Sequence, residues 1–146
     1  MNLRPYQQQA HDAAIEWVKN TADPCVLELP TGSGKSLIVA AIANTLHNIS
    51  KGKHVLCIVP SKELLEQNAE KYEAIGNPCS LFSASVGETC LKYPVVFGTP
   101  ISIKNKIHKV IGLFGRVTNK SAGVTAKRKS YYKMVIGALF AGFLVV

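Results

Sequence analysis

A chain of 146 residues that is 47% hydrophobic can bury the core of one domain and has no room for two. All nine acidic residues lie at or before Glu88, whereas ten of the seventeen basic residues follow it, so the net charge of +8 is unevenly distributed. Residues 89–146 therefore cannot supply a carboxylate side chain to a catalytic or metal site. Their basic character is typical of a surface that binds a nucleic-acid backbone.

The first predicted element is a helix from Pro5 to Asn20. Proline suits the first position of a helix, and the apolar residues after it recur at helical spacing: Ala10, Ala13, Ala14, Trp17 and Val18. Because this N-terminal segment is polar and rich in glutamine, it lacks the features of a secretory signal. We therefore expect a cytoplasmic protein, or one in the host cytoplasm if the chain comes from a phage.

The next segment combines an apolar run, a glycine-rich turn and an amphipathic run. Cys25–Leu29 predicts a strand and Leu37–Leu46 a helix. The turn between them, which we call the phosphate loop, is Pro30-Thr31-Gly32-Ser33-Gly34-Lys35-Ser36. Its two glycines permit backbone angles that aim successive N–H groups at an anion. We expect nucleotide phosphates there rather than an ordinary turn, with Lys35 on the β and γ phosphates and the Ser36 hydroxyl on magnesium.

Strands and helices alternate through the following residues. His54–Val59 predicts a buried parallel strand, and Pro60-Ser61 ends it and caps a helix. Two more strands are predicted at Cys79–Ala84 and Pro94–Gly98, and Thr99-Pro100 ends the second. This alternation predicts an α/β fold, a parallel sheet with flanking helices. Because such sheets bind ligands at the carboxyl ends of their strands, we expect the three polar turns at one edge.

Four short segments follow one another in a recognisable order: Leu3-Arg4-Pro5-Tyr6-Gln7, residues 29–36, residues 59–67 and Phe97-Gly98-Thr99-Pro100. They resemble the adenine-recognising motif and motifs I, Ia and Ib of superfamily 2 helicases. That group includes the DEAD/DEAH-box and type III restriction proteins and phage-type DNA helicases. The resemblance covers about residues 2–110 and implies the first, RecA-like, P-loop NTPase domain. Motif I usually begins with glycine and here begins with Leu29, which the family tolerates.

The resemblance implies a role for each segment. Gln7 would pair with the adenine of ATP, with Arg4 as its support, and the phosphate loop would bind the phosphates and magnesium. The turns of motifs Ia and Ib would contact the backbone of DNA or RNA through Pro60, Ser61, Lys62, Thr99 and Pro100. The chemistry agrees, because a lysine, a helix N-terminus and a hydroxyl bind phosphates without reading bases.

The family also implies a part that this chain lacks. Its members hold magnesium and the attacking water with an Asp-Glu pair on the next strand, and no acidic residue follows Glu88. We expect its second domain, which supplies an arginine finger, to be absent as well. We therefore interpret the chain as the ATP-binding segment of a superfamily 2 DNA helicase without a complete catalytic set, in which Lys35 provides only positive charge. The alternative is a small nucleotide-sensing, nucleic-acid-binding module without helicase activity.

Residues 111–146 differ from the partial domain, residues 1–110. A basic run to Lys133 precedes Met134–Val146, which carries no charge. Three interpretations stay open: a membrane anchor, a buried element of the domain, or a sequence read out of frame or from a truncated gene. The uncharged run is shorter than the roughly 20 residues that a spanning helix needs, so we expect no membrane association. The four cysteines, Cys25, Cys57, Cys79 and Cys90, lack metal-ligand spacing and predict buried free thiols.

Overall fold

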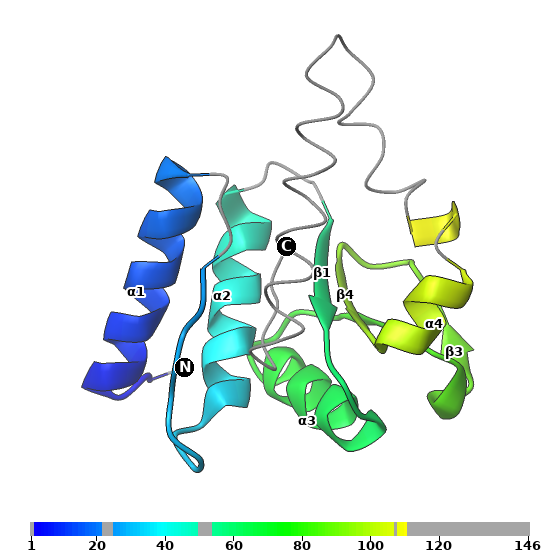
Figure 1. Cartoon of the computed structure of the whole chain (residues 1–146), viewed down its shortest axis with the longest axis horizontal. Helices are drawn as coiled ribbons and strands as arrows, with labels where there is room; N and C mark the ends of the chain where they lie inside the picture. Colours follow the sequence, from blue (N-terminus) through cyan, green and yellow to red (C-terminus); the bar gives the residue numbers. More distant parts are fainter. Residues whose placement is uncertain (1, 22–24, 50–53, 107, 111–146) are drawn as a thin grey trace, which may run out of the picture.

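The computed structural model describes residues 2–21, 25–49, 54–106 and 108–110, so the predicted tail lies outside the described residues. Figure 1 shows the elements in chain order. The helices are α1 (Pro5–Asn20), α2 (Lys35–Ile49), α3 (Lys62–Glu73) and α4 (Pro100–Asn105), with a short 3₁₀ turn η1 (Ala84–Val86). The strands are β1 (Val55–Ile58), β2 (Ser80–Ser83), β3 (Glu88–Thr89) and β4 (Val95–Gly98).

These strands form one sheet in the order β1-β4-β2-β3. The strand β4 is parallel to both neighbours, with Val96 opposite Leu56 on one side and Ser80 on the other. The short β3 pairs antiparallel with β2 at the edge. Every residue of β1 and β4 is buried, as expected for apolar runs that are covered on both faces. The predicted α/β fold with a parallel sheet and flanking helices is confirmed.

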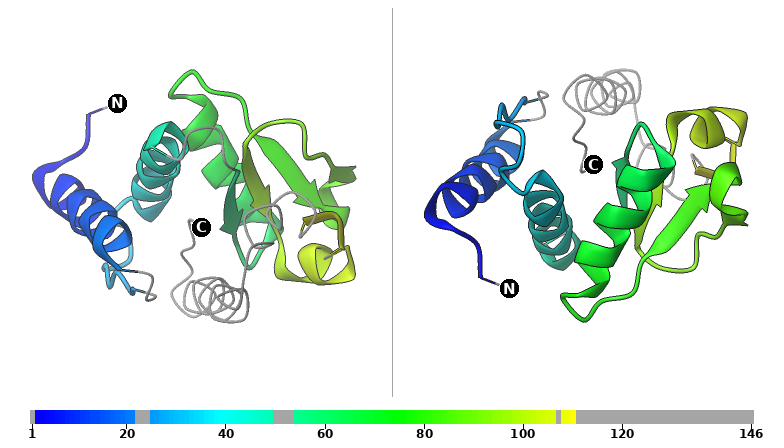
Figure 2. Two further views of the ribbon diagram at one scale, coloured as in Figure 1. Left: turned by 90° about the horizontal axis from the view of Figure 1, so that it is seen from above. Right: turned by 90° about the horizontal axis from the view of Figure 1, so that it is seen from below.

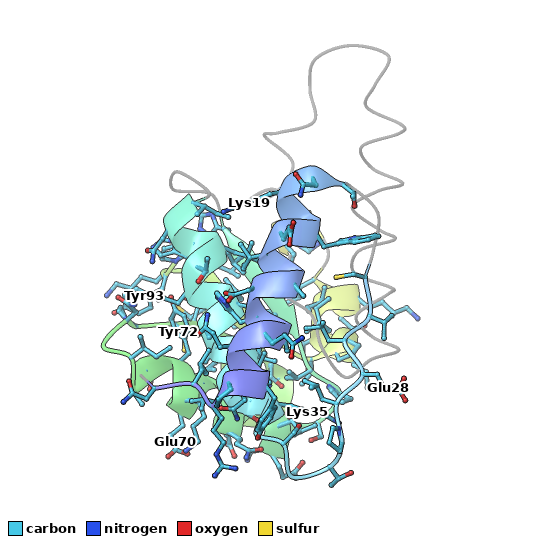
Figure 3. All side chains as sticks on the ribbon, turned by 90° about the vertical axis from the view of Figure 1, so that its left-hand side faces the viewer. Lys19, Glu28, Lys35, Glu70, Tyr72 and Tyr93 are labelled. Atoms are coloured by element: carbon cyan, nitrogen blue, oxygen red, sulfur yellow. The ribbon has the colours of Figure 1, made fainter. Side chains whose placement is uncertain are left out.

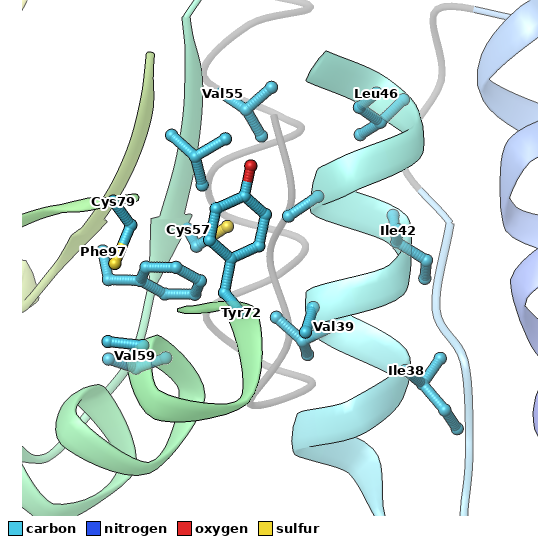
Figure 4. Close-up of a cluster of buried hydrophobic side chains, with 14 of the residues drawn as sticks. Ile38, Val39, Ile42, Leu46, Val55, Cys57, Val59, Tyr72, Cys79 and Phe97 are labelled. Carbon is cyan, nitrogen blue, oxygen red and sulfur yellow. The ribbon is translucent and has the colours of Figure 1, made fainter. Parts of the chain in front are cut away.

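Because alternate residues of a strand point to opposite faces, β1 and β4 contribute to two cores. Cys57 and Phe97 face the larger core, shared with α1, α2 and α3, where the Tyr72 ring centroid lies 5.9 Å from that of Phe97 (Figure 4). The second core lies on the other face of the sheet and contains Leu56, Ile58, Phe82, Val96, Ile103 and Val110. Figure 2 shows α4 on the side of the sheet away from α1 and α2.

The predicted strand at Cys25–Leu29 is wrong. The structure assigns neither helix nor strand to these residues, and in Figure 1 they form an extended segment that leads into α2. Leu27 and Leu29 are half-buried and pack against the larger core, whereas Val26, which precedes Leu27, is 65% exposed. A strand needs a hydrogen-bonded neighbour, and within the described residues no strand pairs with this segment. The apolar run therefore half-buries alternate side chains and leaves the others exposed.

The cysteine prediction holds for two residues of four. None of the four thiols forms a disulfide, but only Cys57 and Cys79 are buried, while Cys25 is half-buried and Cys90 is exposed. Desolvation by burial raises the pKa of Cys57 above its usual range, and the electrostatic effect of Cys79 raises it further by a smaller amount. No helix among the described residues is long and apolar enough to cross a membrane.

Candidate nucleotide and nucleic-acid site

The phosphate loop is a tight turn that leads directly into α2. Gly32 and Gly34 have φ of 80° and 76°, in the left-handed region that side chains disfavour. The Ser33 N–H donates to the Pro30 carbonyl over 3.3 Å, and the Leu37 N–H donates to the Gly34 carbonyl over 3.0 Å. The predicted helix thus begins two residues early, at Lys35, and the positive end of its dipole coincides with the loop.

The side chains of the loop are available to an anion. Lys35 is exposed, and within the described part of the chain no carboxylate forms an ion pair with it. Ser33 is only 7% exposed, and its hydroxyl oxygen is buried without a hydrogen-bond partner among the described residues. A buried hydroxyl without a partner is costly, and a polar ligand group would satisfy it. The residues present therefore fit a phosphate group.

The first turn of α1 is joined to this loop by two hydrogen bonds on one carbonyl. Gln7 Nε2 donates to the Ser33 carbonyl over 2.8 Å, and Tyr6 Oη donates to the same oxygen over 2.9 Å. Gln7 is only 4% exposed, and its Oε1 accepts the Arg4 N–H over 2.9 Å. Sequence reasoning selected Arg4 and Gln7 but missed Tyr6. The sequence signal that could have identified Tyr6 is its position next to Gln7 in the first turn of the predicted helix.

This contact also explains why Gly34 must lack a side chain. A Cβ added at Gly34 would lie 2.6 Å from Gln7 Nε2, whereas one added at Gly32 would have no atom within 4 Å. The second glycine is therefore required twice, by its backbone angle and by the amide that packs on it.

Metal binding has a single candidate ligand in the loop. Ser36 is the second residue of α2 and is half-buried, so its hydroxyl lies at the helix N-terminus beside Lys35. Among the described residues, no group of three histidine, cysteine, aspartate or glutamate side chains could hold a metal ion. Magnesium at this position would therefore depend on the nucleotide phosphates and on water for its other ligands.

The turn after β1 begins α3. The Ser61 hydroxyl accepts the Leu64 N–H over 3.3 Å and caps the helix. Pro60 and Lys62 are exposed, but Lys62 Nζ lies 3.7 Å from Glu66 Oε1, one helical turn away. Hydrogen bonds from its own backbone and from Ser61 lower the pKa of Glu63. The cation of this turn thus has acidic neighbours, which weaken its attraction for an anion.

The turn after β4 has a different character, because Thr99 is only 9% exposed. Its Oγ1 donates to Ser102 Oγ over 3.0 Å and lies 3.2 Å from Ser83 Oγ. Pro100 is the first residue of α4 and is half-buried. Neither serine was selected from the sequence, since Ser83 is 16 residues away and becomes a neighbour only through strand pairing.

Strand pairing brings the turns to one edge. Gly98 of β4 pairs with Ile58 of β1 and with Phe82 of β2, so the three parallel strands end side by side. In Figure 1 the phosphate loop lies at the same end of the molecule, toward which β1 points. The structure thus brings the sequence-selected residues together in two groups, the loop with α1 and the turns of the sheet edge.

Comparison with known protein families gives one finding. The family model described as type III restriction enzyme, res subunit, matches residues 1–135, a range that includes the phosphate loop and both turns. A comparison with curated proteins finds no match.

Proposed function

Because the chain belongs to the family of the type III restriction enzyme res subunit, with the N-terminal domain of a superfamily 2 helicase, we propose that it binds ATP and magnesium as the ATP-binding segment of a superfamily 2 DNA helicase. One observation carries the proposal: Tyr6 and Gln7 both donate to the Ser33 carbonyl. These bonds join the segment for which the family implies adenine recognition to the segment for which it implies phosphate binding.

The phosphates would lie on the loop, at the N-terminus of the fifteen-residue helix α2. The backbone N–H groups around the two glycines and the helix dipole favour negative charge there. Lys35 would neutralise the terminal phosphates, and Ser33 would donate its unpartnered hydroxyl. Pro30 and Thr31 would form the wall of the turn, and Ser36 would bind magnesium, which supplies charge neutralisation between the phosphates when bound.

The hydrogen-bonding capacity of Gln7 supports adenine as the base. An amide side chain has two donor and two acceptor positions, and Gln7 uses one of each on Ser33 and on Arg4. One donor and one acceptor remain. The N6–N7 edge of adenine needs that pair, whereas the O6–N7 edge of guanine presents two acceptors. Gln7 therefore favours adenine, and Gln7→Ala would remove most of the preference.

Nucleic acid would bind along the carboxyl edge of the sheet. The turn at Pro60, Ser61 and Lys62 and the turn at Thr99 and Pro100 follow neighbouring strands, so one backbone could meet both. Contacts of this kind go to phosphates and sugars and would serve DNA or RNA. The proposed partner is therefore a nucleic-acid backbone rather than a base sequence.

Hydrolysis is not part of the proposed activity of this chain. Phosphoryl transfer needs a carboxylate for magnesium and another for the attacking water, and no acidic residue follows Glu88. Phosphate release with ATP should therefore equal the buffer rate, with or without DNA. A steady turnover that Lys35→Ala abolishes would show that an earlier carboxylate completes the site.

The direct test is titration with a fluorescent ADP analogue in the presence of magnesium. Lys35→Ala should remove most of the affinity, because it deletes the charge on the phosphates. Lys19→Ala is the matched control, since Lys19 is an exposed lysine at the other end of the α1–α2 pair (Figure 3). The proposal fails if both variants bind like the wild type.

A further inference from the structure

Four hydroxyl groups form a connected cluster at the carboxyl edge of the sheet. We call Ser83, Ser85, Thr99 and Ser102 the hydroxyl cluster. Ser83 is the last residue of β2, and Thr99 directly follows the neighbouring strand β4. Their side-chain oxygens lie 3.2 Å apart, and Ser102 lies in α4. Ser102 Oγ also accepts the Ala84 N–H over 2.9 Å, so the cluster ties the turn after β2 to the turn after β4.

The protons of the cluster can be assigned from its geometry. A hydroxyl has one proton to donate and two lone pairs that accept. Thr99 Oγ1 donates its proton to Ser102 Oγ, so the 3.2 Å bond between Ser83 and Thr99 must use the proton of Ser83. The proton of Ser85 then serves the 2.8 Å bond to Ser83. Thr99 keeps only acceptor capacity, and a phosphate oxygen accepts but does not donate.

The burial of the cluster also indicates that its hydroxyls bond to one another. Ser83 is fully buried, Ser102 is 6% exposed and Thr99 is 9% exposed, so the three oxygens face one another rather than solvent. Buried hydroxyls that satisfy one another hold their surroundings in one arrangement, because breaking any bond leaves a partner unsatisfied.

We propose that Thr99, Ser83 and Ser102 are positioning residues for nucleic-acid binding: they fix the turn after β4 against the turn after β2, and the Thr99 hydroxyl does not itself contact the backbone. The proposal rests on the proposed function of the same sheet edge. Contacts to the phosphates then belong to exposed groups of that edge, such as Lys62, whose charge Glu66 offsets only in part.

The test measures binding of a fluorescein-labelled oligothymidylate to the full chain. Thr99→Val, Ser83→Ala and Ser102→Ala should each lower the affinity by a similar factor of about 3–10, the range of one lost hydrogen bond. The Thr99→Val/Ser102→Ala double variant should bind like either single variant, because both changes break the same unit. The affinity for the fluorescent ADP analogue should stay unchanged in all of them, which separates positioning of the edge from a general loss of structure.

A direct contact of Thr99 with phosphate gives the opposite pattern. Ser102→Ala would then free the Thr99 proton, so affinity would stay unchanged or rise while Thr99→Val lowers it, and this result overturns the proposal. Thr45→Ala is the control, since it removes a hydroxyl bond to His11 on α1, away from the edge. If Ser83→Ala does not fold, Ser102→Ala still decides. A wild-type chain without salt-dependent binding refutes the nucleic-acid part of the proposed function instead.

Discussion

Replacing Gly34 by alanine is the sharpest perturbation that the structure offers. The φ of 76° places the residue in the left-handed region, which costs a residue with a Cβ about 1–2 kcal/mol. The new Cβ would also lie 2.6 Å from Gln7 Nε2 and push the amide off the Ser33 carbonyl, at a further cost of about 0.5–1.5 kcal/mol. Gly34→Ala should therefore destabilise the chain by roughly 1.5–3.5 kcal/mol.

Gly32→Ala is its matched control. Its φ of 80° imposes the same backbone cost, but no atom lies within 4 Å of the added Cβ. Urea unfolding followed by circular dichroism should show a difference of about 1 kcal/mol between the two variants, and in a Gln7→Ala background that difference should disappear. The preference for ADP over GDP should fall in Gly34→Ala and persist in Gly32→Ala. Equal stability and equal base preference in both variants would refute the coupling of α1 to the phosphate loop.

Tyr6→Phe should weaken the binding of ADP and of GDP by the same factor, about 2–10-fold, because the lost hydroxyl contacts the loop and not the base. Unequal losses of affinity in paired titrations would contradict this. Thiol labelling at pH 8 should modify exposed Cys90 at once and Cys57 only after unfolding, because burial holds Cys57 protonated; rapid labelling of Cys57 in the native chain, seen by mass spectrometry, would count against the fold. The folded chain lowers the pKa of Glu63, so the ionised carboxylate stabilises the fold at pH values above its ordinary pKa of 4.5. This contribution is lost as the pH falls through the lowered pKa of the folded state. Glu63→Gln should therefore flatten the acid side of the Tm–pH profile, and an unchanged profile would show that the bonds from Ser61 and the backbone have no effect.

The fold was predictable where burial alone decides the local structure. The apolar runs that became β1 and β4 are buried on both faces, and α1 begins at Pro5 and ends at Asn20 as its spacing indicated. The run at Cys25–Leu29 shows the limit, because its composition suits a strand but strand formation depends on a partner elsewhere in the chain. The short elements β3 and α4 were missed for a related reason, since two and six residues are too few to show a periodicity.

The candidate site was predictable only in its local parts. The phosphate loop is a continuous segment, so its spacing carried the prediction. Tyr6 and Ser83 act through partners that are 27 and 16 residues away, and only the docking of α1 and the pairing of β2 with β4 bring them together. Such residues carry no motif of their own in a single sequence.

The hydrogen bonds of Gln7 and Thr99 indicate different roles for two residues that the family resemblance treats alike. Gln7 and Thr99 were both selected as groups that touch a ligand, and both are almost fully buried. Gln7 spends one donor and one acceptor on the protein and keeps one of each, so it can read a base without releasing the loop. The only proton of Thr99 is already donated to Ser102, so contact with a phosphate would first require the cluster to break. Two positions that the family resemblance treats alike therefore have different proposed roles in this chain, and the difference lies in the number of donors that the fold leaves free.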